Sequence, residues 1–480
     1  MKKNSLLWLI LLFALLLRLP LLNGSFWLDE AAQALESVRP LSQQLDIVPD
    51  FQPPLMHLLV HFAAQVSTGE WWLRLWGALI PGLVTIWATF KLGEKLFNKQ
   101  VAIVASLLLA TSSLHVFYSQ ELRPYSLPAM WAMLSTLILF KKDFSWWKFA
   151  GVTILGLYSS YLYPFFLIPQ LWLIGKKKGW GQAGKILLVS GVAFAPWLPT
   201  FFKQLAVGQA LRTAIPGWEA VVSIPQLKAL VLVPLKFIYG VLDLQLTPTF
   251  IISGLAFGLI TALAWRNYQN NKQQLSSLKS CLLIGLMPLL SSWLISFAVP
   301  VIQPKRLLFL LPFFYLLIAA PLANKKTPFK IAVMPVVFLL AINLISLATY
   351  WTQPELQREN WRGLKQEIIQ KFPAGQTVAV FSFDESFAPW RWYDPESIAS
   401  LTTGQKNINQ VEDLTGQLKS VTDYQYVLVF DYLRDLTDPT DLLPATVESL
   451  GFSGRGVIDY PGIGFVRIYS QPSSAIGYKL

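Results

Sequence analysis

Long runs of apolar residues alternate with short polar segments over the first 350 positions of the chain. A membrane-spanning helix needs about 20 apolar residues to cross the hydrocarbon layer. The runs at 149–161 and 163–175 are shorter, and a hairpin with both ends on the same side fits them. The pattern predicts about eleven transmembrane helices, at residues 5–22, 73–90, 101–117, 125–140, 149–161, 163–175, 184–201, 247–265, 281–299, 307–323 and 331–349.

The pattern changes after residue 350, where apolar runs shorten to strand length. Three such runs are TVAVFSF at 377–383, YQYVLVF at 424–430 and GFVRIYS at 464–470. A helical period covers 360–371, and Asp394-Pro395 and Tyr460-Pro461-Gly462 are typical of turns. We therefore expect a membrane domain over 1–350 and a small α/β domain over 351–480.

Composition and charge fit this division. The 480 residues are 54% hydrophobic and only 14% charged, against about 25% charged in an average soluble domain. The net charge of +12 would suggest nucleic acid for a soluble protein, but the basic clusters fall in alternate loops, as the positive-inside rule requires. This distribution predicts no nucleic-acid partner, a cytoplasmic N-terminus behind Lys2 and Lys3, and an exported C-terminal domain. The single cysteine, Cys281, excludes an intrachain disulfide.

The long outer loop, 23–72, begins with a pair of acids, Asp29 and Glu30, directly after the first span. Carboxylates this close to a bilayer are costly unless a polar cavity or a ligand uses them. An amphipathic stretch follows Asp29, and a second apolar stretch follows Pro53-Pro54, so we expect two helices lying in the membrane interface. An alternative role for these two acids is to stabilise the N-terminus of a helix by interacting with the helix dipole.

Two further outer loops carry charges beside aromatic residues. Glu121, Arg123 and Tyr125 follow the third span, and Lys305 and Arg306 precede the tenth. A carboxylate can accept the proton of an attacking hydroxyl, and a guanidinium or ammonium can neutralise a departing phosphate. The set suits group transfer from an anionic lipid. Structural ion pairs and interface anchors are the alternatives for these residues.

Four motifs in fixed order resemble a known family. They are FWLDEA after the first span, QPPLMHLL in the outer loop, YSQELRPYSL after the third span and QPKRLLFLLPFF at the tenth. This order resembles the bacterial membrane glycosyltransferases of the dolichyl-phosphate-mannose protein mannosyltransferase type, which belong to glycosyltransferase family 39, with the aminoarabinose transferases as relatives. The resemblance covers residues 5–350 and implies a GT-C fold.

The resemblance also implies an activity, a location and a site. The expected reaction transfers a sugar from a polyprenyl-phosphate donor to a lipid, glycan or protein acceptor at the outer face of the plasma membrane. Asp29 matches the catalytic aspartate, here the expected general base, and Glu30 the acid after it. The expected substrate-binding residues are Gln52, Glu121, Arg123, Tyr125, Tyr161, Tyr163, Lys305 and Arg306.

The chain departs from the family at several positions, and these leave a cofactor open. Gln52 stands where relatives have a basic residue, Phe51 where a metal-binding acid would fall, and Tyr161 to Tyr163 where a histidine would. His57 and His61 are spaced to share a divalent metal on one helical face, although packing is the commoner role for such histidines. The alternative function is a lipid or solute transporter, which commonly shows internal repeats that this chain lacks.

Overall fold

The chain divides into two compact units. The computed structural model describes residues 5–215, 223, 226–244, 247–266, 268, 272–324, 326–393, 397–408 and 412–472. The membrane unit comprises Met1–Asn23, Arg39–Leu205 and Val222–Leu356, and the C-terminal unit comprises Gly24–Val38, Ala206–Val221 and Gln357–Leu480. The segment that carries Asp29 and Glu30 therefore belongs by its contacts to the C-terminal unit, although it ends at Val38 and that unit's main body begins only at Gln357. Lys2, Lys3 and the turn at Asp394-Pro395 lie outside the described residues.

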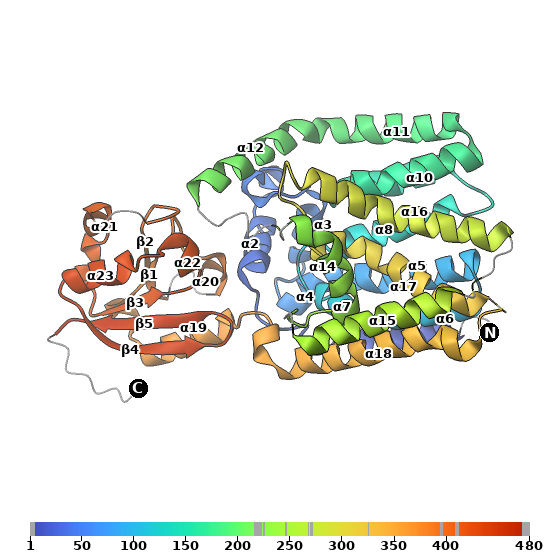
Figure 1. Cartoon of the computed structure of the whole chain (residues 1–480). Coiled ribbons are helices and arrows are strands. Elements are labelled where there is room, and N and C mark those ends of the chain that lie inside the picture. Colours follow the sequence, from blue (N-terminus) through green and yellow to red (C-terminus); the bar gives the residue numbers. More distant parts are fainter. Residues whose placement is uncertain are drawn as a thin grey trace. The chain divides into compact units, whose positions relative to one another are not determined.

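The membrane unit is built from helices (Figure 1). Within the part of the chain that the structure describes, six are long and apolar enough to cross a membrane: Glu70–Leu96, Trp180–Arg212, Pro248–Arg266, Leu275–Ile295, Lys305–Ala323 and Phe329–Thr352. Among the described residues, its α-helices are α1 Ser5–Leu16, α3 Leu55–Ala64, α4 Glu70–Arg74, α5 Ile80–Leu96, α6 Lys99–Thr111, α7 Ser113–Tyr118, α8 Ser126–Leu139, α9 Trp146–Leu157, α10 Tyr163–Lys178, α11 Trp180–Phe194, α12 Leu198–Ala214, α14 Gln226–Tyr239, α15 Pro248–Arg266, α16 Lys272–Ile295, α17 Leu311–Ala319 and α18 Phe329–Thr352. Residues of α12 from Ala206 onward belong to the C-terminal unit.

Each predicted apolar run contains helix, and the predicted multi-pass helical fold is confirmed, but helix length alone does not establish eleven spans. The run at 101–117 is interrupted because α6 ends at Thr111 and Ser112 starts the new helix α7, its hydroxyl accepting from the His115 amide at 3.4 Å. Among the described residues, α14 is a helix that the sequence pattern did not predict.

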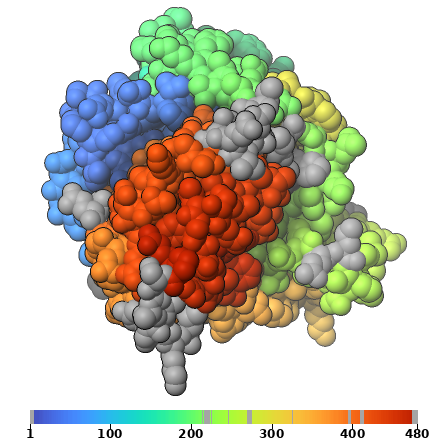
Figure 2. Space-filling model, turned by 90° about the vertical axis from the view of Figure 1, so that its left-hand side faces the viewer, coloured from blue at the N-terminus to red at the C-terminus, as the bar shows by residue number. Residues whose placement is uncertain are grey.

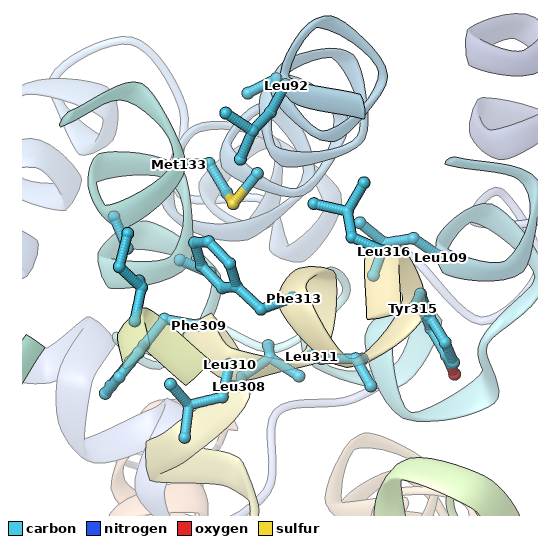
Figure 3. Packing of buried hydrophobic residues seen from close by; sticks show 14 of the residues in the cluster. Leu92, Leu109, Met133, Leu308, Phe309, Leu310, Leu311, Phe313, Tyr315 and Leu316 are labelled. Carbon is cyan, nitrogen blue, oxygen red and sulfur yellow. The ribbon is translucent and has the colours of Figure 1, made fainter. Parts of the chain in front are cut away.

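The core of the membrane unit forms where α17 lies against helices from the first half of the chain. Phe309 and Phe313 both contact Phe166 of α10, with ring centroids 5.5 and 5.8 Å apart. Met133 of α8 lies in the same cluster, with further apolar residues from α5 and α6 beside it (Figure 3). This packing draws together α5 and α17, which are far apart in the sequence, and so fixes the loops at the ends of the helices.

The C-terminal unit is an α/β fold, as predicted. Its sheet has the order β2-β1-β3-β5-β4, in which β1 pairs in parallel with β2 and β3, and β5 is antiparallel to both β3 and β4. In Figure 2 the orange and red residues of the sheet and its helices form one continuous surface. The strands are β1 Thr377–Phe381, β2 Ala399–Thr402, β3 Tyr426–Phe430, β4 Ser453–Tyr460 and β5 Gly464–Ser470.

Helices cover both faces of this sheet, because alternate strand residues point to opposite sides. Ala379 and Phe381 pack with α19 Trp361–Lys371 and α20 Ala388–Tyr393. Val378 and Val380 pack on the other face with α21 Glu412–Gln417 and α23 Leu442–Ser449, and α22 Arg434–Thr437 follows β3. Helix α2, Leu28–Ser37, packs against α20, and Leu28 reaches the first of these two cores.

Candidate active site

Asp29 and Glu30 lie in the first turn of α2. The chain enters this helix through Trp27 in an extended conformation, and the positive end of the helix dipole favours acids in the first turn. The two side chains nevertheless differ in environment, since Glu30 is completely buried and Asp29 is partly exposed. Of the pair, Asp29 is therefore the carboxylate that a substrate can reach.

Glu30 is held by an arginine of the C-terminal unit. Its Oε2 atom lies 3.6 Å from Nε of Arg358, and the Arg358 side chain is only 7% exposed. A buried carboxylate is expensive without a countercharge, so this pair stabilises the position of α2 provided both partners remain. The sequence pattern did not identify Arg358 as a site residue. The feature of the sequence that points to Arg358 is the charged dipeptide Arg358-Glu359, which follows soon after the last apolar run.

Glu359 is a second acid close to Asp29. Its carboxylate accepts hydrogen bonds from Trp361 Nε1 at 2.6 Å and from the Tyr432 hydroxyl at 2.8 Å. Burial raises the pKa of Glu359 to about 7, the charge of Asp29 adds to this, and the two hydrogen bonds oppose it. The Trp361 ring is fixed edge-on against Tyr432, with centroids 5.2 Å apart. Asp29 is thus accompanied by a carboxyl group that changes its charge near neutral pH.

When the pH rises from 5 to 8, we expect the Glu359→Gln variant to lose less folding stability than the unmodified chain. The folded state keeps a proton on Glu359 between its usual pKa of 4.5 and about 7, so stability falls as the pH rises through this window and stays lower above it. The effect is on the order of 3 kcal/mol. Glutamine is neutral and can still accept from Trp361 while donating to Tyr432. Thermal unfolding at both pH values measures the difference.

Glu385→Gln is the matched control, because Glu385 is an exposed glutamate of the same unit, paired with Arg391. It should leave the change between pH 5 and pH 8 as in the unmodified chain. Equal slopes for Glu359→Gln and the unmodified chain would contradict the proposed titration of Glu359.

Asp50 is the centre of a polar cluster in the membrane unit. Its Oδ1 lies 3.0 Å from an Arg123 guanidinium nitrogen, and its Oδ2 lies 2.8 Å from His57 Nε2. The Gln52 amide contacts both Asp50 and His57. Burial raises the pKa of Asp50, but Arg123 and His57 outweigh it, so that the net shift is downward. Asp50 therefore carries its charge in this cluster.

The backbone at Phe51 explains how Asp50 and Gln52 meet. Phe51 has φ 40° and ψ 30°, the left-handed conformation that is uncommon for a bulky residue. The carboxylate in this loop thus comes from Asp50, one position before the expected metal-binding acid. Asp50 and His57 are ligand types for a divalent metal. A metal site at His57 and His61 stays a prediction; His61 is buried beside the Phe62 ring.

Tyr161 is connected to this loop through Gln204. The Tyr161 hydroxyl donates to Gln204 Oε1 and accepts from Trp197 Nε1, and the Gln204 amide donates to the carbonyl oxygens of Ile47 and Gln52 at 2.7 and 3.2 Å. The structure therefore brings together two expected site residues, Gln52 and Tyr161, that are more than 100 positions apart. Nothing in the sequence pattern indicated that Gln204 would contact these residues.

The remaining expected residues are placed differently. Lys305 Nζ lies 5.4 Å from the centre of the Tyr125 ring, and an Arg306 guanidinium nitrogen donates to the Val301 carbonyl at 3.2 Å. Glu121 is buried. Tyr163 is fully buried in the helical core, and its hydroxyl donates to Ser135 Oγ at 3.2 Å. Tyr163 is thus a packing residue in this structure and is not brought to the Asp50 cluster.

Comparison with known proteins relates these features to a family. Residues 51–202 match the family described as dolichyl-phosphate-mannose-protein mannosyltransferase. Comparison with curated proteins gives no match. ArnT from Cupriavidus metallidurans is similar in structure over 100% of both chains, with a TM-score of 0.56 in the apo state and 0.55 when bound to undecaprenyl phosphate, at 11% sequence identity in each case. The chain has the fold of the GT-C membrane glycosyltransferases.

The match to the mannosyltransferase family covers two of the four motifs. It includes the loop with Gln52 and His57 and the segment with Glu121 and Arg123, which together form most of the Asp50 cluster. Asp29 lies outside the matched range, as do Lys305 and Arg306. The roles of these three residues rest on motif order and on the geometry described above.

Proposed function

We propose that this protein is a glycosyltransferase that moves a sugar from a polyprenyl-phosphate donor to a hydroxyl of a lipid, glycan or protein acceptor. The observation that carries the proposal is the match of residues 51–202 to the dolichyl-phosphate-mannose-protein mannosyltransferases. The similarity in fold to ArnT, a protein seen with undecaprenyl phosphate, supports a lipid phosphate as the carrier. Localisation in the plasma membrane, with the site at its outer face, completes the proposal.

In the proposed reaction, the acceptor hydroxyl attacks the anomeric carbon of the donor sugar. The bond between that carbon and the phosphate oxygen breaks, and polyprenyl phosphate leaves with the electron pair. Asp29 takes the hydroxyl proton as general base, which its partial exposure permits. Attack on the face opposite the leaving group inverts the configuration at the anomeric carbon.

The departing phosphate needs positive charge, and the proposed source is Lys305 and Arg306. Phosphate gains charge as the sugar bond breaks, so a cation at this position stabilises the transition state more than the bound donor. Arg123 was predicted for the same role. The ion pair between Arg123 and Asp50 supports a second role for Arg123, which is to orient the loop at 50–52. Variants of Asp50 and Arg123 distinguish phosphate binding from loop orientation.

The proposal is tested by measuring consumption of a panel of polyprenyl-phosphate sugars by membranes that contain the protein. Sealed spheroplasts and inverted vesicles are compared, so that the accessible face is determined in the same experiment. We expect one donor to be consumed, with release of polyprenyl phosphate, only when the outer face is accessible. Transport of donor without cleavage would favour a transporter instead, and activity only from the cytoplasmic face would overturn the orientation.

A further inference from the structure

A pocket of about 610 Å³ lies on the membrane unit among three helices. Its lining comes from α5, from α8 with the loop that follows it, and from α9, and α8 packs against both of the other helices. The volume falls within the range typical of small-molecule sites. Among the described residues that line it, none is assigned to the proposed reaction, so this pocket is a separate site.

One part of the pocket is apolar. Leu134, Leu137 and Ile138 of α8 are joined there by Trp87 of α5 and Val152 of α9. All of these side chains except Leu137 remain partly exposed, so the packing of the three helices leaves apolar surface uncovered. An acyl chain lying in the pocket covers such a surface and keeps it out of water.

The other part of the pocket, at the ends of α5 and α8, is basic. Lys91 and Lys95 follow Trp87 by about one and two turns of α5, and Lys141 comes directly after the end of α8. Glu94 is the acid among the described lining residues, and its carboxylate lies 3.4 Å from Lys91 Nζ. With three lysines and one glutamate, this end of the pocket has an excess of positive charge beside apolar surface.

The backbone of Lys141 is fixed where it meets the pocket. Its amide donates to the Ile138 carbonyl at 3.1 Å, and its carbonyl accepts from Lys178 Nζ of α10 at 3.4 Å. The same Lys178 ammonium lies 5.7 Å from the centre of the Phe144 ring. The structure thus brings together, at one end of the membrane unit, basic residues from three clusters that the sequence assigns to the cytoplasmic side.

We propose that this pocket binds one anionic glycerophospholipid from the leaflet on the predicted cytoplasmic side, with an acyl chain along α8 and the phosphate at Lys95 and Lys141. An ammonium group binds phosphate as a point charge, and basic pockets between transmembrane helices on this side are typical sites for anionic headgroups. The alternative role of these lysines is to anchor the helix ends at the interface without selecting a lipid. The inference does not depend on the proposed reaction, because lipid binding is measured without a sugar donor.

The test is lipid retention by the full chain in neutral detergent, measured by native mass spectrometry and by thermal unfolding. The probes are phosphatidylglycerol, phosphatidylcholine with the same acyl chains, and glycerol 3-phosphate. We expect one phosphatidylglycerol to be retained at a concentration about 10-fold lower than phosphatidylcholine, and to raise the unfolding temperature. Lys95→Gln with Lys141→Gln should remove most of this preference. Glycerol 3-phosphate should not displace the lipid, since it has no acyl chain; displacement at equal concentration would overturn the assignment to a lipid.

Lys142→Gln with Lys148→Gln is the matched control, because it removes two exposed lysines close to α8 and α9 that are not among the described residues lining the pocket. Lys95→Gln alone guards against misfolding of the double variant and should show a smaller loss in the same direction. Val152→Trp fills the apolar part without changing the charge, and it should weaken retention of phosphatidylglycerol. Equal retention of the two lipids by the unmodified chain, or an equal loss in the control and the pocket variants, would overturn the inference.

Discussion

Asp29→Asn is expected to reduce sugar transfer by about 10²- to 10⁴-fold, the usual cost of removing a general base. The amide has nearly the shape of the carboxylate but cannot accept the proton of the attacking hydroxyl. Because Asp29 is partly exposed and Glu30 carries the buried pair with Arg358, the substitution should leave α2 in place. The measurement is the rate of donor consumption at saturating donor, together with thermal unfolding of the same preparation.

Asp46→Asn is the matched control, since Asp46 is an exposed aspartate of the same loop, residues 23–72, and is not assigned to the site. Its transfer rate should equal that of the unmodified chain. A near-normal rate for Asp29→Asn, at an unfolding temperature close to that of the control, would remove Asp29 from the mechanism. A fall in unfolding temperature confined to Asp29→Asn would assign it a structural role instead.

Asp50→Ala is expected to destabilise the membrane unit by on the order of 3 kcal/mol, because it removes the carboxylate that pairs with the largely buried Arg123 and contacts His57. Removing both Asp50 and Arg123 should cost less than the sum of the single substitutions, since the two opposite charges of the pair are then removed together. Thermal unfolding of the two single variants and the double variant measures this coupling.

The same variants decide the role of Arg123. If Arg123 only orients the loop at 50–52, its removal should change donor affinity little once Asp50 is already absent. If it also binds the lipid phosphate, Arg123→Ala should weaken donor binding in both backgrounds. Glu94→Ala breaks the exposed pair with Lys91 and serves as the control, for which a change of less than about 1 kcal/mol is expected. A similarly small change for Asp50→Ala would contradict the coupling.

Periodicity predicted the elements that bury continuous apolar surface and missed those that do not. Strands β1 and β3 are fully buried five-residue runs, and both lie in predicted segments. Edge strands β2 and β4 were missed because β2 has four residues and β4 is mostly exposed and contains two glycines. Helix α14 was missed since it is short, is interrupted by Pro234 and carries two lysines.

The sequence predicted only those site residues that stand out within a single loop. Asp29 and Glu30 stood out because acids beside a span are costly, whereas the partners Arg358 and Glu359 are more than 300 positions away and belong to a segment of ordinary soluble composition. Asp50 is one of the acids of the loop at 23–72. Its pairing with Arg123 depends on the helix packing of the membrane unit, which no local pattern encodes.

The assignment of residues 24–38 to the C-terminal unit has a consequence for how the protein is made. The ribosome delivers α2 near the beginning of synthesis, but the surface on which it packs, including α20 and the core around Trp361, emerges only near the end. Contacts between such distant segments form late, because the intervening chain must first be ordered. Membrane insertion and docking of α2 are thus separated in time, so that the nascent chain crosses the bilayer with α2 still undocked.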